Sequence, residues 1–401
     1  MPIDPEDSEI LEGLPTEHVT VEAQRRRGLL FLGMAVAGAQ LTMAIQMGLN
    51  ANFLKGVLGI SGFQFGMLEA VRESCGVVAF GILAILAGIA EPFIGAAMLM
   101  LLAVGIGSYF AAPSYLWILL LSLVWSQGLH CWMPLPNSMT LAMAEPGRAG
   151  HRLGQIQAAG SAGYGGGLIA ALLLTLAGIS MRPMYLLAGT AAALAAAACL
   201  GIPRQIKAPG PRLVFRRRYG LYYTLCFLEG WRKQISISFA GFLLVEQYHA
   251  KLQTILLLMT TVQVIGYLAS PRVGRLVDRI GERPILLFYY FCLTVLFVGY
   301  ALIRTPHVLY GIFILDNSFF VFGVALTTYV NRIAPKTEHT PTLSMGVAMN
   351  HVAAVAMPFV GGLMWKYIGF KWAFLTGAAT AAVSVLAALR LPRSLKISGI
   401  R

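Results

Sequence analysis

Twelve apolar stretches, separated by short loops, occupy almost the whole chain. A helix rises about 1.5 Å per residue, so a stretch of about 20 residues can cross a hydrocarbon core about 30 Å thick. Lipid offers the backbone no hydrogen bonds, and each stretch must therefore be helical. This pattern predicts an all-α integral membrane protein with twelve transmembrane helices. The predicted spans are residues 28–50, 62–88, 93–111, 115–143, 154–178, 182–201, 220–245, 252–271, 284–304, 307–331, 343–365 and 370–390.

The composition excludes most soluble classes of protein. Mean hydropathy is +0.72 and only 12% of the residues are charged, against about 25% in soluble globular domains. The chain has no phosphate-binding loop, nucleophile elbow or zinc-helix motif, so an enzyme is not predicted and no cofactor is expected. The five cysteines stand singly within spans, and their spacing indicates neither a disulfide framework nor a metal site.

The positive charge is sorted between the two sets of loops. Most of the 30 lysines and arginines lie in loops on the side that also holds both termini. Positively charged loops face the cytoplasm, so we expect both termini there, in a bacterial-type inner membrane. The net charge of +13 is explained by this bias and by contact with anionic lipid headgroups. No basic stretch is interleaved with aromatic residues on a soluble domain, and a nucleic-acid partner is not expected.

The longest internal loop divides the chain into two sets of six spans. We predict a disordered acidic cytoplasmic tail at 1–24, a six-helix bundle at 25–201, a basic cytoplasmic linker at 202–219, a second six-helix bundle at 220–392 and a short tail at 393–401. Six plus six spans with cytoplasmic termini favour two pseudo-symmetric bundles around a central cavity. We expect the protein to be a monomer.

One loop carries a recognisable motif. Residues 274–284 read Gly-Arg-Leu-Val-Asp-Arg-Ile-Gly-Glu-Arg-Pro, which resembles the cytoplasmic loop of the major facilitator superfamily, Gly-x-Leu-x-Asp-Arg-x-Gly-Arg-Arg. Glycine permits a tight turn, and Asp278 can cap the next helix or pair with a basic neighbour. The arginines can bridge to the other bundle. The predicted cytoplasmic gate is Gly274, Arg275, Asp278, Arg279, Gly281 and Arg283.

Other segments extend this resemblance. Pro358-Phe-Val-Gly361-Gly362 is similar to a bend that these transporters place in span eleven. The equivalent loop of the first half, residues 81–92, keeps its glycines and lacks the Asp-Arg charges, and span five lacks the proline of the antiporter motif. The resemblance implies a secondary active transporter that moves a small solute by alternating access, with spans one, four, seven and ten lining the path. No ATP-binding domain fits in the loops, so protons or another coupling ion would drive transport.

Seven ionisable residues lie at membrane depth, where each costs about 2.5–3.5 kcal/mol on a helix facing lipid. Two triads share the spacing i, i+3 and i+4, which places their members on one helix face. Local ion pairing and roles in lining the cavity or carrying a proton remain alternative interpretations. The proton-coupling or ion-pair candidates are Glu69, Arg72, Glu73, Glu229 and Asp316.

Span seven holds two cations and one acid, which leaves one cation in need of an anion. We expect the planar guanidinium of Arg232 to grip an anionic solute, and Lys233 to pair with Glu229 or with an acid of a neighbouring helix. The predicted solute is therefore a small organic anion. The alternatives are a proton-driven exporter of hydrophobic or cationic drug-like compounds and a transporter-like sensor or assembly protein. The full set of candidate substrate-binding residues is Arg232, Lys233, Gln46, His130, Asn317, Asn350 and His351.

Overall fold

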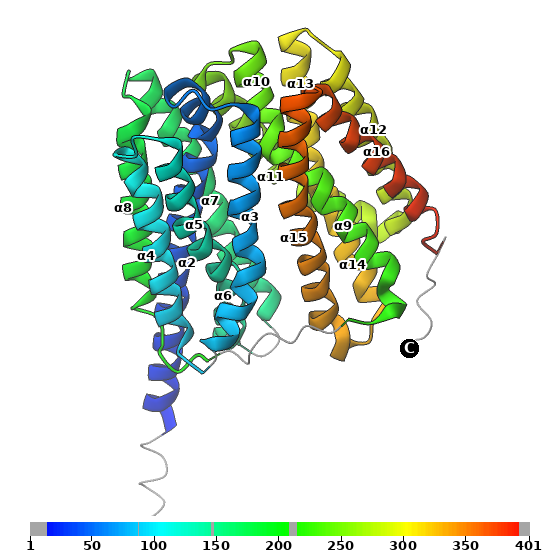
Figure 1. Ribbon diagram of the computed structural model, residues 1–401. Helices are drawn as coiled ribbons and strands as arrows, with labels where there is room; N and C mark the ends of the chain where they lie inside the picture. Colours follow the sequence, from blue (N-terminus) through cyan, green and yellow to red (C-terminus); the bar gives the residue numbers. More distant parts are fainter. Residues whose placement is uncertain (1–13, 87, 146–147, 208–214, 393–401) are drawn as a thin grey trace, which may run out of the picture.

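The N-terminal half of the molecule is a bundle of six membrane-length helical segments (Figure 1). The computed structural model describes residues 14–86, 88–145, 148–207 and 215–392, and all regular structure within them is helical. The first half contains α2 (Leu14–Asn52) with its terminal π-turn η1 (Phe53–Val57), α3 (Gly62–Ile85), α4 (Glu91–Gly107) with η2 (Ser108–Phe110), α5 (Tyr115–Trp132), α6 (Leu135–Met143), α7 (Ala149–Leu176) and α8 (Met181–Cys199).

The C-terminal half repeats this organisation. After η3 (Arg217–Tyr219) come α9 (Gly220–Gln234), η4 (Ile235–Ala240), α10 (Gly241–Tyr248), α11 (Leu252–Ile280), α12 (Glu282–Leu302), α13 (Pro306–Ser318), η5 (Phe319–Gly323), α14 (Val324–Ile333), α15 (Lys336–Tyr367) and α16 (Phe370–Ala388). Spans seven and ten are the composite segments α9–η4–α10 and α13–η5–α14. The described residues therefore form twelve spans in two groups of six, which confirms the predicted fold class.

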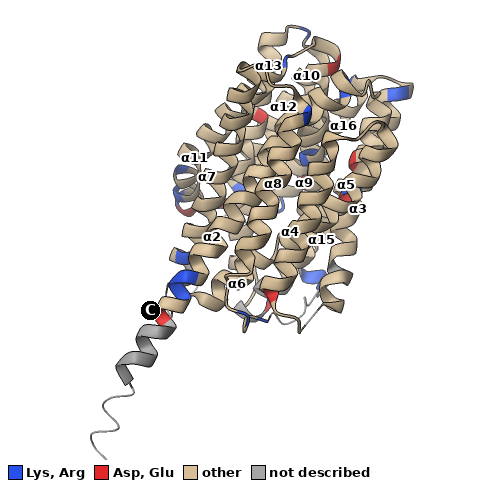
Figure 2. Cartoon of the chain, turned by 90° about the vertical axis from the view of Figure 1, so that its left-hand side faces the viewer, with Lys and Arg blue, Asp and Glu red and all other residues tan. Residues whose placement is uncertain are grey.

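Ten segments are long and apolar enough to cross a membrane by length and composition alone. The other two are α3 and α9–η4–α10, and these are the segments that carry the charged triads. Large apolar side chains such as Leu194 and Leu386 are more than 60% exposed on the outer surface. A soluble protein would aggregate through such a surface, whereas a lipid-facing helix requires it. Figure 2 shows most of the length of the helices made of uncharged residues, with lysine and arginine gathered at the foot of α2.

One boundary differs from the prediction. Helix α2 begins at Leu14, so residues 14–24 are helical and do not form the disordered tail expected from their acidic composition. Residues 1–13 and 393–401 lie outside the described part of the chain. Span four is interrupted between Trp132 and Leu135, where Pro134 and Pro136 remove backbone donors, as their positions in the sequence indicate.

The two bundles meet most closely where α3 packs against α15. A Cβ atom at Gly66 would lie 2.4 Å from the carbonyl oxygen of Pro358 and 2.7 Å from the Cα atom of Gly362. Only a residue without a side chain fits there, because both neighbours are backbone atoms. The Pro-x-x-Gly-Gly segment of α15 is thus part of the contact between the bundles, as small residues are at close helix contacts in membranes.

The two ends of the molecule are formed by different helix ends. Helix α2 begins at one end, which we call the terminal face, and α10 and the start of α13 lie at the other end, the distal face (Figure 1). Since α2 runs from the terminal to the distal face, the position of a residue along α2 gives its depth in the molecule.

Candidate functional site

A cavity of about 280 Å³ lies between the two bundles. Four phenylalanines form part of its wall: Phe65, Phe242, Phe313 and Phe320. The polar lining residues are amides, hydroxyls and one carboxylate, and no lysine or arginine is among the described residues that line it. These polar residues are Asn50, Glu69, Tyr164, Ser236, Ser238, Gln263 and Asn317. We call this the central cavity.

A second cavity, of about 360 Å³, shares Tyr164 and Gln263 with the central cavity. Its lining includes Gln40 of α2, whereas the central cavity reaches Asn50 of the same helix. Gln40 lies nearer the terminal face than Asn50 because α2 starts at that face. The second cavity therefore leads from the central cavity toward the terminal face, and its polar side chains are also uncharged: Gln40, Asn137, Gln157, Ser161, Tyr164 and Gln263.

Polar contacts between the bundles close the distal face. The Lys55 ammonium of η1 lies 2.9 Å from the Glu246 carboxylate of α10. The side-chain amide of Asn52 donates a hydrogen bond of 2.9 Å to the backbone oxygen of Ala250. Trp365 of α15 donates to the other oxygen of Glu246 at 2.7 Å, which fixes that carboxylate in place. The central cavity is therefore sealed by polar contacts on the distal side.

The irregular segment η4 presents its hydroxyl groups in two directions. Ser238 donates to Glu69 across the bundle interface at 2.9 Å, and Ser236 donates to Asp316 within its own bundle at 3.0 Å. A π-helix changes the angular spacing of side chains, and such turns often occur at functional sites. Ser238 thus brings span seven into contact with a charged residue of span two, and Ser236 with one of span ten.

The charged triad of α3 forms a compact ion-pair cluster. The Arg72 guanidinium lies 2.6 Å from a Glu69 oxygen and 2.7 Å from a Glu73 oxygen. All three side chains are at least 90% buried, and the guanidinium also lies 5.4 Å from the centre of the Trp125 ring. Both glutamates pair with one arginine, in agreement with the interpretation that these charges form local ion pairs. Glu69 also lines the central cavity, so pairing and a role in transport are compatible for this residue.

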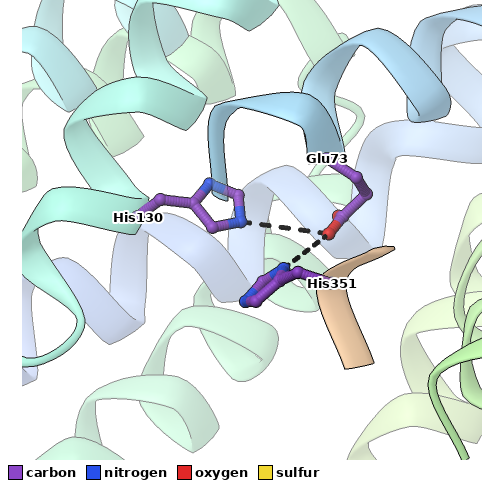
Figure 3. Close-up of side chains that lie close together, drawn as sticks. All are labelled: Glu73, His130 and His351. Carbon is purple, nitrogen blue, oxygen red and sulfur yellow. Dashed lines mark ion pairs between the residues drawn. The ribbon is translucent and has the colours of Figure 1, made fainter. Parts of the chain in front are cut away.

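Two predicted histidines meet beside this cluster. His130 of α5 and His351 of α15 both face Glu73, with nitrogen–oxygen distances of 3.9 and 3.7 Å (Figure 3). Neither histidine lines the central cavity. Their neighbourhood is instead the contact between α3, α5 and α15.

The structure corrects the expectation for span seven. Arg232 is 1% exposed, its guanidinium lies 5.2 and 4.7 Å from the ring centres of Tyr289 and Tyr290, and it donates to Ser384 at 3.2 Å. The side chain therefore points into the C-terminal bundle, away from the central cavity. Lys233 is the next residue, about 100° further around the helix, and its side chain is exposed. Its expected ion pair with Glu229 is not formed within the described part of the chain.

The remaining candidates are scattered. Asn317, a candidate for binding substrate, lines the central cavity, and its role in binding stays a prediction. Asp316 is fully buried and accepts hydrogen bonds from Ser236 and Tyr300 inside its bundle.

The last two candidates lie close to the bundle interior without lining the central cavity. Gln46 donates to Asn50 at 3.3 Å, and Asn350 donates to the Cys226 carbonyl at 3.4 Å. Tyr164, Gln263 and the two serines of η4 were not predicted. Small polar residues inside an apolar span are the signal that could have found Ser236 and Ser238.

The predicted gate has a different local structure. Helix α11 continues through Gly274 and Asp278, and only Gly281, with φ of +85°, makes the turn to α12. Asp278 is exposed, and α12 begins without a side-chain cap, so the proposed capping role is absent. Glu282 instead pairs with Arg332 of α14 at 2.8 Å. That ion pair lies within the C-terminal bundle.

Three comparisons place this architecture among known proteins. The family profile of the Major Facilitator Superfamily matches residues 222–398, and no curated protein matches the chain. The nucleoside transporter NupG has a TM-score of 0.73 at 15% identity, covering 90% of this chain and 98% of its own.

Two further solved structures are similar to the same extent. A bacterial homologue of the human lysosomal transporter Spinster, in an inward-facing and occupied conformation, has a TM-score of 0.70 at 12% identity, covering 91% of this chain and 96% of its own. The D-xylose-proton symporter has a TM-score of 0.70 at 14% identity, covering 91% and 98%. At these identities the likeness concerns the fold.

Proposed function

We propose that this chain, whose residues 222–398 match the Major Facilitator Superfamily profile and whose fold is that of solved transporters, is a secondary active transporter for a small, uncharged solute rich in hydrogen-bonding groups. The observation that carries this proposal is the lining of the central cavity, which offers amides, hydroxyls and aromatic rings around one carboxylate. Amides and hydroxyls both donate and accept hydrogen bonds, so they match the hydroxyl and amide groups of a neutral solute. The phenylalanines suit a flat apolar face.

An anionic solute fits this cavity poorly. Its charge would lie near Glu69, and the cation expected to compensate it, Arg232, points into the C-terminal bundle. Burying a charge without a partner is costly in a medium of low polarity. The organic anion expected from the sequence therefore loses its main support. Nucleosides and D-xylose, the solutes named for two proteins of similar fold, belong to the favoured class.

We place proton coupling at Glu69. This carboxylate touches the central cavity, the Arg72 guanidinium of its own helix and the Ser238 hydroxyl of the other bundle. Protonation would remove its charge and weaken its pairing with Arg72. Solute binding, proton binding and the contact between the bundles thus converge on one side chain, as coupled transport requires.

The charge bias of the loops supports an orientation. With the terminal face in the cytoplasm of a bacterial-type inner membrane, the closed distal face would be extracellular. The second cavity then leads from the central cavity toward the cytoplasm. This conformation would exchange solute with the inside of the cell.

Proteoliposome counterflow tests the solute class. We expect exchange of uridine or xylose and none of a small carboxylate anion. Gln263→Ala and Asn317→Ala should each weaken the apparent affinity about 2–10-fold, the value of one lost hydrogen bond. Gln127→Ala is the matched control, because this amide of α5 bonds to Cys131 and lines neither cavity described above. Exchange of anions alone would refute the proposal, and binding without exchange would favour a sensor.

Glu69→Gln tests the coupling site. The variant keeps the shape of the side chain and replaces the carboxylate by an amide, which carries no charge. We expect counterflow to continue while an imposed pH gradient no longer concentrates the solute. Gradient-driven accumulation equal to that of the wild type would show that the proton is carried elsewhere, without affecting the assignment of the solute class.

A further inference from the structure

Three potential metal ligands converge at the contact between the bundles. Glu73 of α3, His130 of α5 and His351 of α15 are far apart in the sequence, yet their ligand atoms all lie within 4.8 Å of one another. Figure 3 shows both imidazole rings facing the same carboxylate oxygen. Its distances of 3.9 and 3.7 Å to the two rings are too long for hydrogen bonds.

The local hydrogen bonds orient both imidazoles. His130 Nδ1 lies 2.8 Å from the Ser126 carbonyl oxygen, which can only accept, so Nδ1 carries the hydrogen. The lone pair of Nε2 then faces Glu73. Such a hydrogen bond to the second ring nitrogen is the usual support of a metal-binding histidine. His351 Nδ1 is buried and has no hydrogen-bond partner among the described residues.

The charge of the neighbourhood favours a cation. Glu69 and Glu73 share the single guanidinium of Arg72, so this buried cluster carries an excess negative charge. Glu73 uses one oxygen for Arg72 and turns the other toward the histidines. The side chain of His351 is 15% exposed, which gives an ion a route to the cluster.

We propose that Glu73, His130 and His351 bind a divalent transition-metal ion of the Zn²⁺ class, with water as a fourth ligand. Two histidines and a carboxylate are a common ligand set of zinc, whose bonds of about 2.0–2.2 Å place tetrahedral ligands about 3.4 Å apart. The separations of 3.9 and 3.7 Å from Glu73 need to close by a few tenths of an ångström, whereas the ligand atoms of the two histidines, which lie within 4.8 Å of each other, need to approach by up to about 1.4 Å. Mg²⁺ and Ca²⁺ prefer oxygen ligands and do not suit two imidazoles.

The bound ion would lock the two bundles together. His351 belongs to the C-terminal bundle, whereas Glu73 and His130 belong to the N-terminal bundle. A shared ion bonds all three and opposes any movement of α15 relative to α3. Metal binding itself does not depend on the transport function proposed above, but its predicted consequence, arrest of the transport cycle, does.

Binding is tested on purified full-length protein without solute. Isothermal titration with Zn²⁺ should give one site per chain, Zn²⁺ should raise the melting temperature, and Mg²⁺ should do neither. Co²⁺ as a probe should give the visible absorption of a tetrahedral site. His351→Ala should weaken Zn²⁺ binding by at least about tenfold, since loss of a group that only supports a ligand already costs about 10–100-fold. His307→Ala, at an exposed histidine of α13, is the matched control and should bind as the wild type does.

A second variant keeps all three ligand residues and changes only the space around them. A Cβ atom at Gly76 would lie 2.7 Å from His351 Nδ1 and 3.0 Å from the His130 ring, so Gly76→Ala should displace the rings and also weaken binding. Zn²⁺ affinity unchanged in both His351→Ala and Gly76→Ala, or a Co²⁺ spectrum without tetrahedral bands, would overturn the site.

Counterflow tests the lock separately. Zn²⁺ should inhibit the wild type and spare His351→Ala. Inhibition equal in both would refute the lock, whereas absence of counterflow in metal-free wild-type protein would count against the transport function and leave the binding result standing.

Discussion

The ion pair between Lys55 and Glu246 joins the bundles at the distal face, and its removal should open that face. Glu246→Gln keeps the side-chain shape and an oxygen that can still accept the hydrogen bond from Trp365. It removes the charge that attracts Lys55 across the interface. The bond to Trp365 lies within one bundle and survives their separation. The change in the conformational equilibrium therefore comes from the ion pair alone.

The free energy that the ion pair contributes is estimated from the exposure of its two side chains. The Lys55 side chain is 33% exposed and that of Glu246 is 11% exposed, so the pair is partly screened by water. Exposed ion pairs contribute about 0.2–1 kcal/mol, and we take the upper end because Glu246 is largely buried. A difference of about 1 kcal/mol changes an equilibrium about fivefold. We expect the population open at the distal face to rise by this factor.

Cysteine labelling measures this population. Ala51 lines the central cavity, so Ala51→Cys should react with a membrane-impermeant maleimide added on the distal side of the membrane only when the distal face is open. Four of the native cysteines are buried, and the fifth, Cys292, is replaced by serine in the assay background. Labelling of Ala51→Cys should be about five times faster with Glu246→Gln present.

A double-mutant cycle separates this contact from general loosening. Lys55→Gln should accelerate labelling to a similar extent, and the double variant should add little, because both single changes break the same contact. Lys251→Gln is the control, since it removes an exposed charge at the same face that forms no ion pair in the described part of the chain. Unchanged labelling in Glu246→Gln, or full additivity with Lys55→Gln, would refute the reasoning.

Further predictions concern packing, span seven and pH. Gly66→Ala should cost about 1–3 kcal/mol of stability, seen as a lower melting temperature, because its Cβ atom would meet the backbone at Pro358. Arg232→Lys should lower the melting temperature and leave solute affinity unchanged, because the guanidinium packs on tyrosines away from the central cavity; weaker binding at unchanged stability would contradict this. Hydrogen bonding from Arg152 lowers the pKa of Glu145 from 4.5 to about 2. The ionised carboxylate therefore contributes stability that is fully present above pH 4.5 and is lost as the pH falls through about 2. The difference in melting temperature between the wild type and Glu145→Gln should shrink over that interval.

Local patterns in the sequence were sufficient for the number and order of the spans and for one charged cluster. The break of span four at Pro134 and Pro136 and the turn at Gly281 follow from the backbone chemistry of proline and glycine. The pairing of Arg72 with both glutamates follows from the i, i+3 and i+4 geometry of a single helix. These features need no knowledge of neighbouring helices.

The partners of the charged residues in span seven do not follow from their spacing along the helix. The spacing of Glu229, Arg232 and Lys233 repeats that of α3, yet this triad does not form the same cluster. The aromatic rings of Tyr289 and Tyr290 on α12 hold Arg232 inside the bundle instead. A helix offers several faces, and the elements packed against it decide which partners a side chain meets.

The sequence by itself determined that the chain spans a membrane as two sets of six helices, because hydrophobic length and the spacing of breaks are properties of consecutive residues. Only the tertiary structure decided what lines the central cavity and which groups meet across it. Ser238 reaches Glu69, and His351 faces Glu73, through the packing of helices from different halves of the chain. Contacts between such distant residues depend on helix rotation and depth, which a single sequence does not encode in any local pattern.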